Sequence, residues 1–250
     1  MAGAQAMELI EVDGLSCAAR LADITFALGA GEMLGIIGPN GSGKSTLLQC
    51  LAGILDFAGK ACFEGRPLAE ISANERARRI GFLPQACESA WALRVEDVVA
   101  LGRLPWGDRD SGAIGEAARQ AGVEALLDRR VDRLSGGEQA RAWLARVLAG
   151  RPRLLAADEP IASLDLYYQR SVMETLRRYA DAREGRGVVL AIHDFGLAAR
   201  YCDRLCLLEG GRLRALGSPR EVLTEPLLSS VFRVPVRVDL DADPPVVTLR

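Results

Sequence analysis

A glycine-rich loop between two apolar runs constrains the fold of this chain more than any other segment. The loop follows the strand-like run 33–37 and precedes the helix-compatible run 47–51. Its glycines allow successive backbone N–H groups to turn toward an anion at the positive end of a helix dipole. Lys44 offers a cation to outer phosphates, and the Ser45 hydroxyl is a ligand type for Mg²⁺. The pattern predicts a nucleotide phosphate site made of Gly38, Pro39, Asn40, Gly41, Ser42, Gly43, Lys44, Ser45 and Thr46.

Charge and hydropathy exclude several other classes of protein. The net charge of −2 gives no electrostatic argument for nucleic acid as the main partner. No apolar run approaches the roughly 20 residues that a membrane-spanning helix needs. Residues 1–6 lack the basic start and apolar stretch of a signal peptide. We therefore expect a cytoplasmic protein that reaches a membrane only by docking to another protein.

Six cysteines are dispersed along the chain, mostly among apolar neighbours. None has the neighbouring His or second Cys pair that a zinc site requires. Reduced, buried thiols are therefore expected rather than a metal site or disulfides. The six are Cys17, Cys50, Cys62, Cys87, Cys202 and Cys206.

The remaining periodicity predicts an α/β protein. Residues 7–34 alternate apolar and polar side chains between glycine turns, which predicts short antiparallel strands. Farther along, strand-like runs alternate with helical ones, which indicates a mostly parallel sheet with a helical insertion in the middle. The predicted strands are 60–63, 81–83, 154–157, 188–192 and 205–208, the predicted helical stretches are 95–148, 166–182 and 195–201, and a final hairpin is expected within 236–249.

Two adjacent acids, Asp158 and Glu159, end the apolar run 154–157. If the strand continued through both residues, their side chains would point to opposite faces and could not share one task. One acid can then hold Mg²⁺, while the other orients and deprotonates an attacking water. A solvated strand end is the alternative, and the phosphate loop upstream favours the chemical interpretation.

A second glycine-rich segment precedes the helical run 139–149. Ser135 and Glu138 form the pattern of a capping box, which stabilises a helix start. The two glycines between them, Gly136 and Gly137, are not needed for a cap. They would let a phosphate approach the N–H groups of the helix N-terminus.

Two further polar residues follow strand-like runs. His193, the only histidine, follows the run 188–192, and Gln85 follows 81–83. An isolated histidine at a strand end is more often structural or solvated than catalytic. Ligands gather at the carboxyl ends of strands in parallel α/β sheets, however, which shifts the balance for His193 toward a site role. Gln85 carries no signal of its own.

The order of these motifs resembles the nucleotide-binding subunit of ABC transporters over nearly the whole chain. Residues 134–138 resemble the signature motif, which separates this family from other phosphate-loop ATPases. The other correspondences are residues 38–46 with the Walker A loop, Gln85 with the Q-loop glutamine, Asp158 and Glu159 with the Walker B aspartate and catalytic glutamate, Ser163, Leu164 and Asp165 with the D-loop, and His193 with the switch histidine.

The resemblance implies a fold and a domain organisation. The expected fold is a P-loop NTPase core with a mostly parallel sheet, an N-terminal antiparallel β subdomain and an inserted α-helical subdomain. Residues 1–250 would form one nucleotide-binding domain. Within it, the helical signature subdomain would span about 86–152, and a C-terminal helix and hairpin tail about 218–250.

The resemblance also implies ATP and Mg²⁺ as cofactors and a homodimer that encloses two ATP molecules. The phosphate loop of one subunit would face residues 135–137 of the other. Catalysis is expected from Glu159, which would polarise the water, and from His193, Gln85 and Lys44. Ser45, Gln85 and Asp158 would hold the metal, and further nucleotide contacts would come from Ser135, Gly136, Gly137, Glu138 and Asp165.

One segment favours a particular branch of the family. Residues 95–106 look like the helical segment of importers for iron–siderophore, haem or cobalamin, and residues 217–224 add support. We expect an ATP-hydrolysing subunit docked to transmembrane permease subunits at the cytoplasmic face of the cell (inner) membrane, serving a substrate-binding protein indirectly, with no direct nucleic-acid contact. The alternatives are a soluble ABC ATPase of iron–sulfur cluster assembly, or a non-transport ABC ATPase acting on nucleic acid or ribosomes.

The sequence departs from the family pattern at three places. Residues 16–21 contain no aromatic ring to stack on adenine, and Arg20 is the nearest candidate, since a guanidinium can stack on a base. Ala140 stands where a Gln often follows the signature motif, and Ile161 replaces a frequent Thr. Neither of the last two positions is expected to touch the chemistry.

Overall fold

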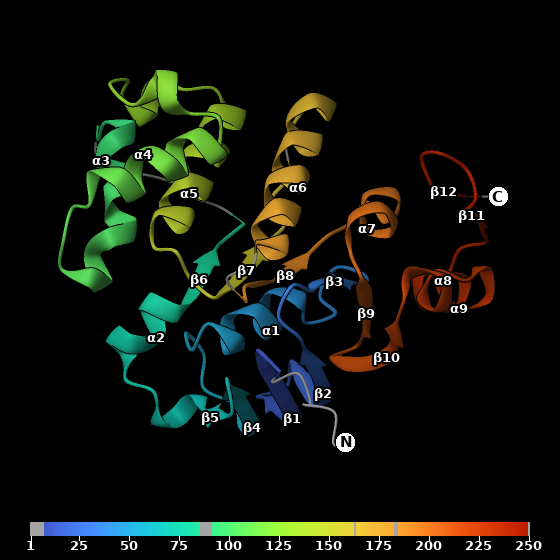
Figure 1. The fold of residues 1–250 in the computed structure, drawn as a ribbon. Coiled ribbons are helices and arrows are strands. Elements are labelled where there is room, and N and C mark those ends of the chain that lie inside the picture. The colour runs from blue at the N-terminus through green and yellow to red at the C-terminus, as the bar shows by residue number, and fades with distance from the viewer. Residues whose placement is uncertain (1–7, 86–91, 163, 183–184, 250) are drawn as a thin grey trace, which may run out of the picture.

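A six-stranded sheet organises the chain in the computed structural model, which describes residues 8–85, 92–162, 164–182 and 185–249 (Figure 1). The predictions on Cys87 and Ser163 lie outside these residues. The strand order is β10-β9-β3-β8-β7-β6; β10 pairs antiparallel with β9 and the other neighbours are parallel. The strands are β3 (Met33–Ile37), β6 (Ile80–Leu83), β7 (Leu154–Asp158), β8 (Gly187–Ala191), β9 (Arg204–Glu209) and β10 (Arg212–Gly217). The predicted mostly parallel sheet is confirmed.

The central strands are almost entirely apolar, with Asp158 at the end of β7 as the exception, because both faces of the sheet are covered. All residues of β3, β7 and β8 are buried, as expected for parallel strands between two layers. Side chains alternate between two cores: Leu34 and Ile36 enter one, and Met33 and Ile37 enter the other.

The first core lies between the large sheet and a smaller antiparallel sheet of order β2-β1-β4-β5. Helix α1 (Lys44–Leu51) contributes Leu47 and Leu48 to this core. The small sheet contains β1 (Ile10–Cys17), β2 (Leu21–Leu28), β4 (Ala58–Phe63) and β5 (Arg66–Pro67). The predicted N-terminal antiparallel strands are therefore confirmed, and β5 adds to them.

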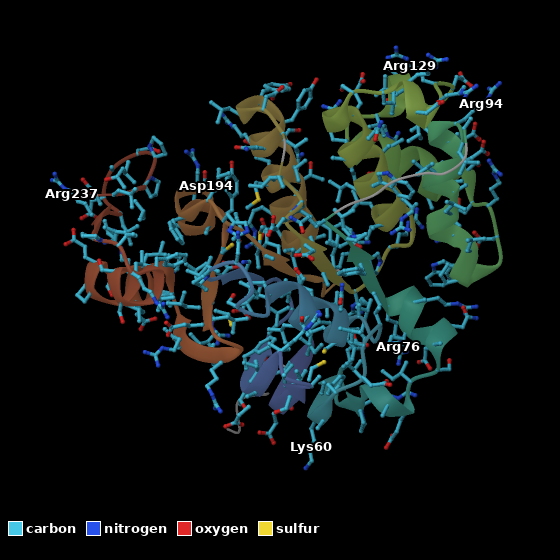
Figure 2. The ribbon with its side chains drawn as sticks, turned by 180° about the vertical axis from the view of Figure 1, so that it is seen from behind. Lys60, Arg76, Arg94, Arg129, Asp194 and Arg237 are labelled. Atoms are coloured by element: carbon cyan, nitrogen blue, oxygen red, sulfur yellow. The ribbon has the colours of Figure 1, made fainter. Side chains whose placement is uncertain are left out.

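Helices inserted between β6 and β7 lie at one end of the molecule, where α5 packs against β6 (Figure 1). Helix α5 contacts both α3 and α4. Figure 2 shows Arg94 and Arg129 together at the far tip of this region, where Val95 N donates to Arg129 O, and Lys60 at the opposite end. The elements are α3 (Val95–Ala100), η2 (Leu101–Trp106), α4 (Ser111–Gln120), η3 (Glu124–Leu126), η4 (Val131–Arg133) and α5 (Gly136–Ala149). The predicted α-helical spacing around Val123 and Leu127 is wrong, since this stretch holds only the 3-10 turn η3.

The remaining helices lie outside the insertion between β6 and β7. Helices α6 (Leu166–Asp181) and α7 (Phe195–Tyr201) confirm the predicted helical stretches, whereas α2 (Ala73–Arg79), with η1 (Leu68–Glu70) before it, was not predicted. The C-terminal part contains α8 (Pro219–Val222), α9 (Glu225–Phe232) and the expected hairpin, β11 (Val236–Asp239) and β12 (Val246–Leu249). The limits 86–152 and 218–250 for the two parts remain predictions.

The described residues bear on the predictions for the cysteines and for membrane-spanning helices. Cys17, Cys50, Cys62, Cys202 and Cys206 are free thiols. All of these except the half-buried Cys62 are buried as predicted. Within the described ranges, no helix has both the length and the apolar character needed to cross a bilayer.

Gly102 determines how closely η2 approaches α5. A Cβ atom at this position would lie 1.9 Å from the backbone oxygen of Arg146, which cannot swing away. We expect Gly102→Ala to destabilise the fold by roughly 1–3 kcal/mol, the usual cost of forcing an extra carbon into packed structure. Thermal unfolding measures this, with Gly115→Ala in α4 as the matched control.

Gly115 has nothing within 4 Å of a built Cβ atom. Alanine there should stabilise the helix by about 1 kcal/mol, because glycine is the poorer helix former. Equal melting temperatures for the two variants would contradict the packing argument.

Candidate functional site

The phosphate loop joins β3 to α1, as its apolar flanks predicted. Gly43 occupies the N-cap of α1 with φ 105°, and a Cβ there would come 2.5 Å from Leu21 Cδ2. Only glycine fits this combination of positive φ and close approach. The helix then begins at Lys44, so its positive end faces the loop.

The Lys44 side chain folds back over its own loop. Its Nζ donates to Gly38 O at 3.0 Å and to Pro39 O at 3.2 Å, and the residue is only 5% exposed. Burial lowers the Lys44 pKa, while the nearby carboxylates of Glu159 and Asp158 raise it. Two loop carbonyls thus hold the Lys44 amino group in position at the centre of the loop.

A cavity of about 560 Å³ opens in front of this loop. Its walls come from the phosphate loop, from the turn between β1 and β2, and from the carboxyl ends of three strands. The volume lies in the range typical of small-molecule and cofactor sites. The lining residues are Arg20, Asn40, Gly41, Gly43, Lys44, Ser45, Thr46, Gln85, Glu159 and His193.

The two adjacent acids do not continue one strand. Strand β7 ends at Asp158, and Glu159 has φ 50°, a left-handed conformation that is uncommon outside glycine. The turn places Glu159 on the cavity wall, while Asp158 remains 4% exposed beside Ser45. The two side chains approach the same site from different directions.

Asp158 has the features of a metal ligand. Burial raises its pKa, and a hydrogen bond from the Ser45 hydroxyl opposes that rise. Its Oδ1 is buried and has no hydrogen-bond partner among the described residues. A buried carboxylate oxygen without a partner, next to a hydroxyl, fits the oxygen ligands that Mg²⁺ prefers.

Two side chains hold the carboxylate of Glu159 in place. Gln85 Nε2 donates to Glu159 Oε2 at 2.7 Å, and His193 Nε2 lies 2.5 Å from Glu159 Oε1. The three residues follow or end the strands β6, β7 and β8, which are neighbours in the sheet. The strand order thus gathers them at one edge.

The second glycine-rich segment lies outside this cavity. Ser135 and Glu138 form the predicted capping box at the start of α5. Asp165 caps α6 by accepting from Tyr168 N at 3.0 Å. The structure thus brings together Lys44, Ser45, Gln85, Asp158, Glu159 and His193. Gly136 lines a second cavity that shares Gln85 and Glu159 with the first, whereas Ser135, Gly137, Glu138 and Asp165 line neither cavity.

Sequence pattern alone offered only a weak argument for Arg20, as the nearest candidate to stack on adenine. It lines the cavity, and its backbone carbonyl lies 3.0 Å from a Cβ built at Gly43. No local pattern marks Arg20, because the contact between the β1–β2 turn and the phosphate loop is made by the tertiary structure.

A buried loop lysine, a hydroxyl-paired aspartate and a positioned glutamate define a phosphate-loop ATPase. Residues 21–162 match the sequence model of the family described as ABC transporter. The chain belongs to the ABC transporter family and is an ATP-binding ATPase of that family.

Individual relatives agree with this assignment. The chain is 47% identical over 215 residues to the hemin import ATP-binding protein HmuV of Streptomyces coelicolor, covering 84% of this chain and 76% of the relative. It is 43% identical over 227 residues to the protein of the same name from Pseudomonas putida, covering 87% and 88%. A solved chain described as an inward-facing metal-chelate type ABC transporter aligns with a TM-score of 0.80 and 27% identity, covering 93% of this chain and 92% of that chain.

Proposed function

We propose that this chain is the ATP-hydrolysing subunit of an importer for a metal chelate, with haem as the preferred substrate. The observation that carries the ATPase chemistry is that Lys44, Ser45 and Glu159 line one cavity. Asp158 is buried beside Ser45, next to these residues. The names of the relatives from Streptomyces and Pseudomonas support haem over siderophores or cobalamin. The transported substrate itself would contact the permease.

The cavity supplies groups for binding the triphosphate. The Lys44 ammonium and the N–H groups at the start of α1 would bind the outer phosphates. Ser45 and Asp158, with Gln85 beside them, would hold Mg²⁺, which neutralises charge on the phosphate oxygens when bound. A donor that the fold holds in place, as Gly38 O and Pro39 O hold Lys44, stabilises phosphate charge with little reorganisation.

Glu159 is placed to act on the attacking water. Its carboxylate is held by two partners, and its side chain is 15% exposed, so it can accept a proton inside a restricted space. His193 lies beside it and would donate to the γ-phosphate once nucleotide is bound. Gln85, which donates to the second carboxylate oxygen of Glu159, would contact the metal.

Gly136 is exposed at the start of α5, and neither Gly136 nor Gly137 lines the phosphate-loop cavity. We propose that a second copy of the chain supplies this helix start to cover the γ-phosphate, which produces an ATP-sandwich homodimer. The pair would dock to permease subunits at the cytoplasmic face of the cell membrane. A substrate-binding protein would act on the other side of that membrane.

Reconstitution tests the proposed function. The chain is placed in proteoliposomes with the permease encoded beside its gene, and ATP-dependent uptake of haem is compared with uptake of cobalamin and a ferric siderophore. Haem uptake that stops without this chain supports the proposal. A neighbouring cluster-scaffold gene and no permease, or uptake of another chelate alone, would contradict it.

His193→Ala should slow ATP hydrolysis while leaving the fold intact. His193 is exposed, with its side chain 46% accessible, so its removal leaves no core cavity. We expect kcat to fall roughly 30-fold, the rate equivalent of losing one charge-assisted hydrogen bond to the transferred phosphate. Steady-state ATPase assays and thermal unfolding measure the two effects.

The neighbouring residue provides the control. Asp194 caps α7 by accepting from Leu197 N, and Figure 2 shows it at the start of that helix. Asp194→Asn keeps a capping side chain and should leave kcat near the wild-type value. A His193→Ala protein that unfolds more easily but keeps its specific activity would assign His193 a structural role.

A further inference from the structure

The starts of α5 and α6 lie side by side. A Cβ built at Gly137 would lie 3.4 Å from Leu164 Cδ2 and 3.8 Å from Tyr168 Cδ2. The first turn of α5 therefore rests on the loop before α6 and on the first turn of α6. The two helix starts form one continuous surface.

A buried arginine joins the two helices. The guanidinium carbon of Arg141, one turn into α5, lies 3.8 Å from the centroid of the Tyr168 ring. Arg141 is 7% exposed, and its Nε has no hydrogen-bond partner among the described residues. A buried guanidinium without a full set of partners is costly, so the ring face is an important compensating contact.

Stabilising the fold does not by itself require a buried arginine stacked on a tyrosine ring. An apolar side chain of similar volume fills such a position at least as well as a buried charge. A cation stacked on a ring, in contrast, fixes distance and orientation between two elements. The Arg141–Tyr168 contact therefore fixes the position of the α5 start relative to the α6 start.

The joined surface has features that suit a partner. The first N–H groups of each helix have no intrahelical acceptor, which leaves the positive ends of α5 and α6 facing outward. Leu166 and Tyr167 at the start of α6 are 84% and 75% exposed. The surface thus combines anion-binding N–H groups with exposed apolar side chains.

We propose that Arg141 and Tyr168 are positioning residues that hold the starts of α5 and α6 in register for binding the ATP-loaded second copy of the chain. This inference rests on the proposed ATP-sandwich dimer. The pair touches neither nucleotide nor the reacting atoms. It acts through Gly136 and Gly137, which meet the phosphate, and through the exposed start of α6 beside them.

The test replaces the ring and the cation separately. Tyr168→Leu removes the ring face, Tyr168→Phe keeps it, and Arg141→Met removes the charge at similar volume. We expect Tyr168→Leu and Arg141→Met each to raise the protein concentration for half-maximal ATP-driven dimerisation about tenfold, and the double variant to do no more, as for one shared cation–π contact. Sedimentation in the non-hydrolysing Glu159→Gln background measures dimerisation.

Two further measurements separate positioning from general stability. Nucleotide affinity of the isolated subunit should stay at the wild-type value, and Tyr168→Phe should restore dimerisation fully. The matched control is Arg186→Met, which breaks a second cation–π contact, 4.5 Å from the Tyr179 ring, near the other end of α6. That variant should dimerise like the parent.

The outcomes distinguish this inference from the proposed function. A parent protein that dimerises with ATP while Tyr168→Leu matches it would overturn the positioning role alone. A Phe variant as weak as the Leu variant would do the same. A parent protein that binds ATP but never dimerises would overturn the sandwich, and the positioning role with it.

Discussion

Replacing Glu159 by Gln should reduce ATP hydrolysis by about 1,000-fold, within the range for loss of a general base. The amide keeps the size of the carboxylate but cannot accept the proton of the attacking water. ATP affinity should persist, because the Lys44 contacts to Gly38 and Pro39 do not involve this side chain. The trapped nucleotide should then hold two subunits together, and size-exclusion chromatography with ATP detects that dimer.

The control removes a carboxylate elsewhere. Glu174 lies on the surface of α6, where it pairs with Arg170 at 2.7 Å. Glu174→Gln should hydrolyse ATP at the parent rate. If Glu159→Gln did so too, Glu159 would not be the base, and another group would have to activate the water.

Removing the Lys44 ammonium should weaken nucleotide binding itself. Lys44 is a buried cation at the centre of the phosphate loop, and its nearest carboxylates belong to Asp158 and Glu159. In Lys44→Ala the outer phosphates lose a charged donor, and the Gly38 and Pro39 carbonyls lose the Lys44 hydrogen bonds, although Pro39 O still accepts from Ser42 N. We expect ATP affinity to fall about 100-fold, the upper range for a hydrogen bond to a charged group.

Calorimetry with ATP measures this loss, and Lys60→Ala is its matched control. Lys60 is exposed on β4, and Figure 2 places it at the far end of the small sheet. Its removal should leave ATP affinity unchanged. Equal affinity for Lys44→Ala and the wild-type protein would contradict the phosphate-site assignment.

Much of the fold followed from local pattern. The runs that became β3, β7 and β8 are buried at every position and, apart from Asp158 at the end of β7, hold only glycine and apolar side chains, as expected for strands covered on both faces. Helix α2 was missed because it has no buried residue and therefore no apolar period. The 3-10 turn η3 was predicted as α-helix because apolar residues at suitable spacing do not specify the hydrogen-bond pattern.

The site divides in the same way. The glycine-rich loop, its lysine and the acids after a buried strand were predictable, because each depends on residues a few positions apart. The conformation of Glu159 was not, since the sequence does not show whether β7 continues past Asp158. No local pattern marked Gln85 as a site residue. Family resemblance alone suggested it, and the structure then showed its hydrogen bond to Glu159.

The sequence alone determined that this chain binds the phosphates of a nucleotide, because a loop dipole and a neighbouring lysine are local properties of nine residues. The tertiary structure decided which side chains line the cavity in front of that loop. Gln85 and His193 are 74 and 34 residues from Glu159, and the adjacent positions of β6, β7 and β8 in the sheet bring them together. It also placed the Gly136–Gly137 helix start outside the phosphate-loop cavity and beside α6. Long-range packing sets these positions, and no short stretch of sequence records them.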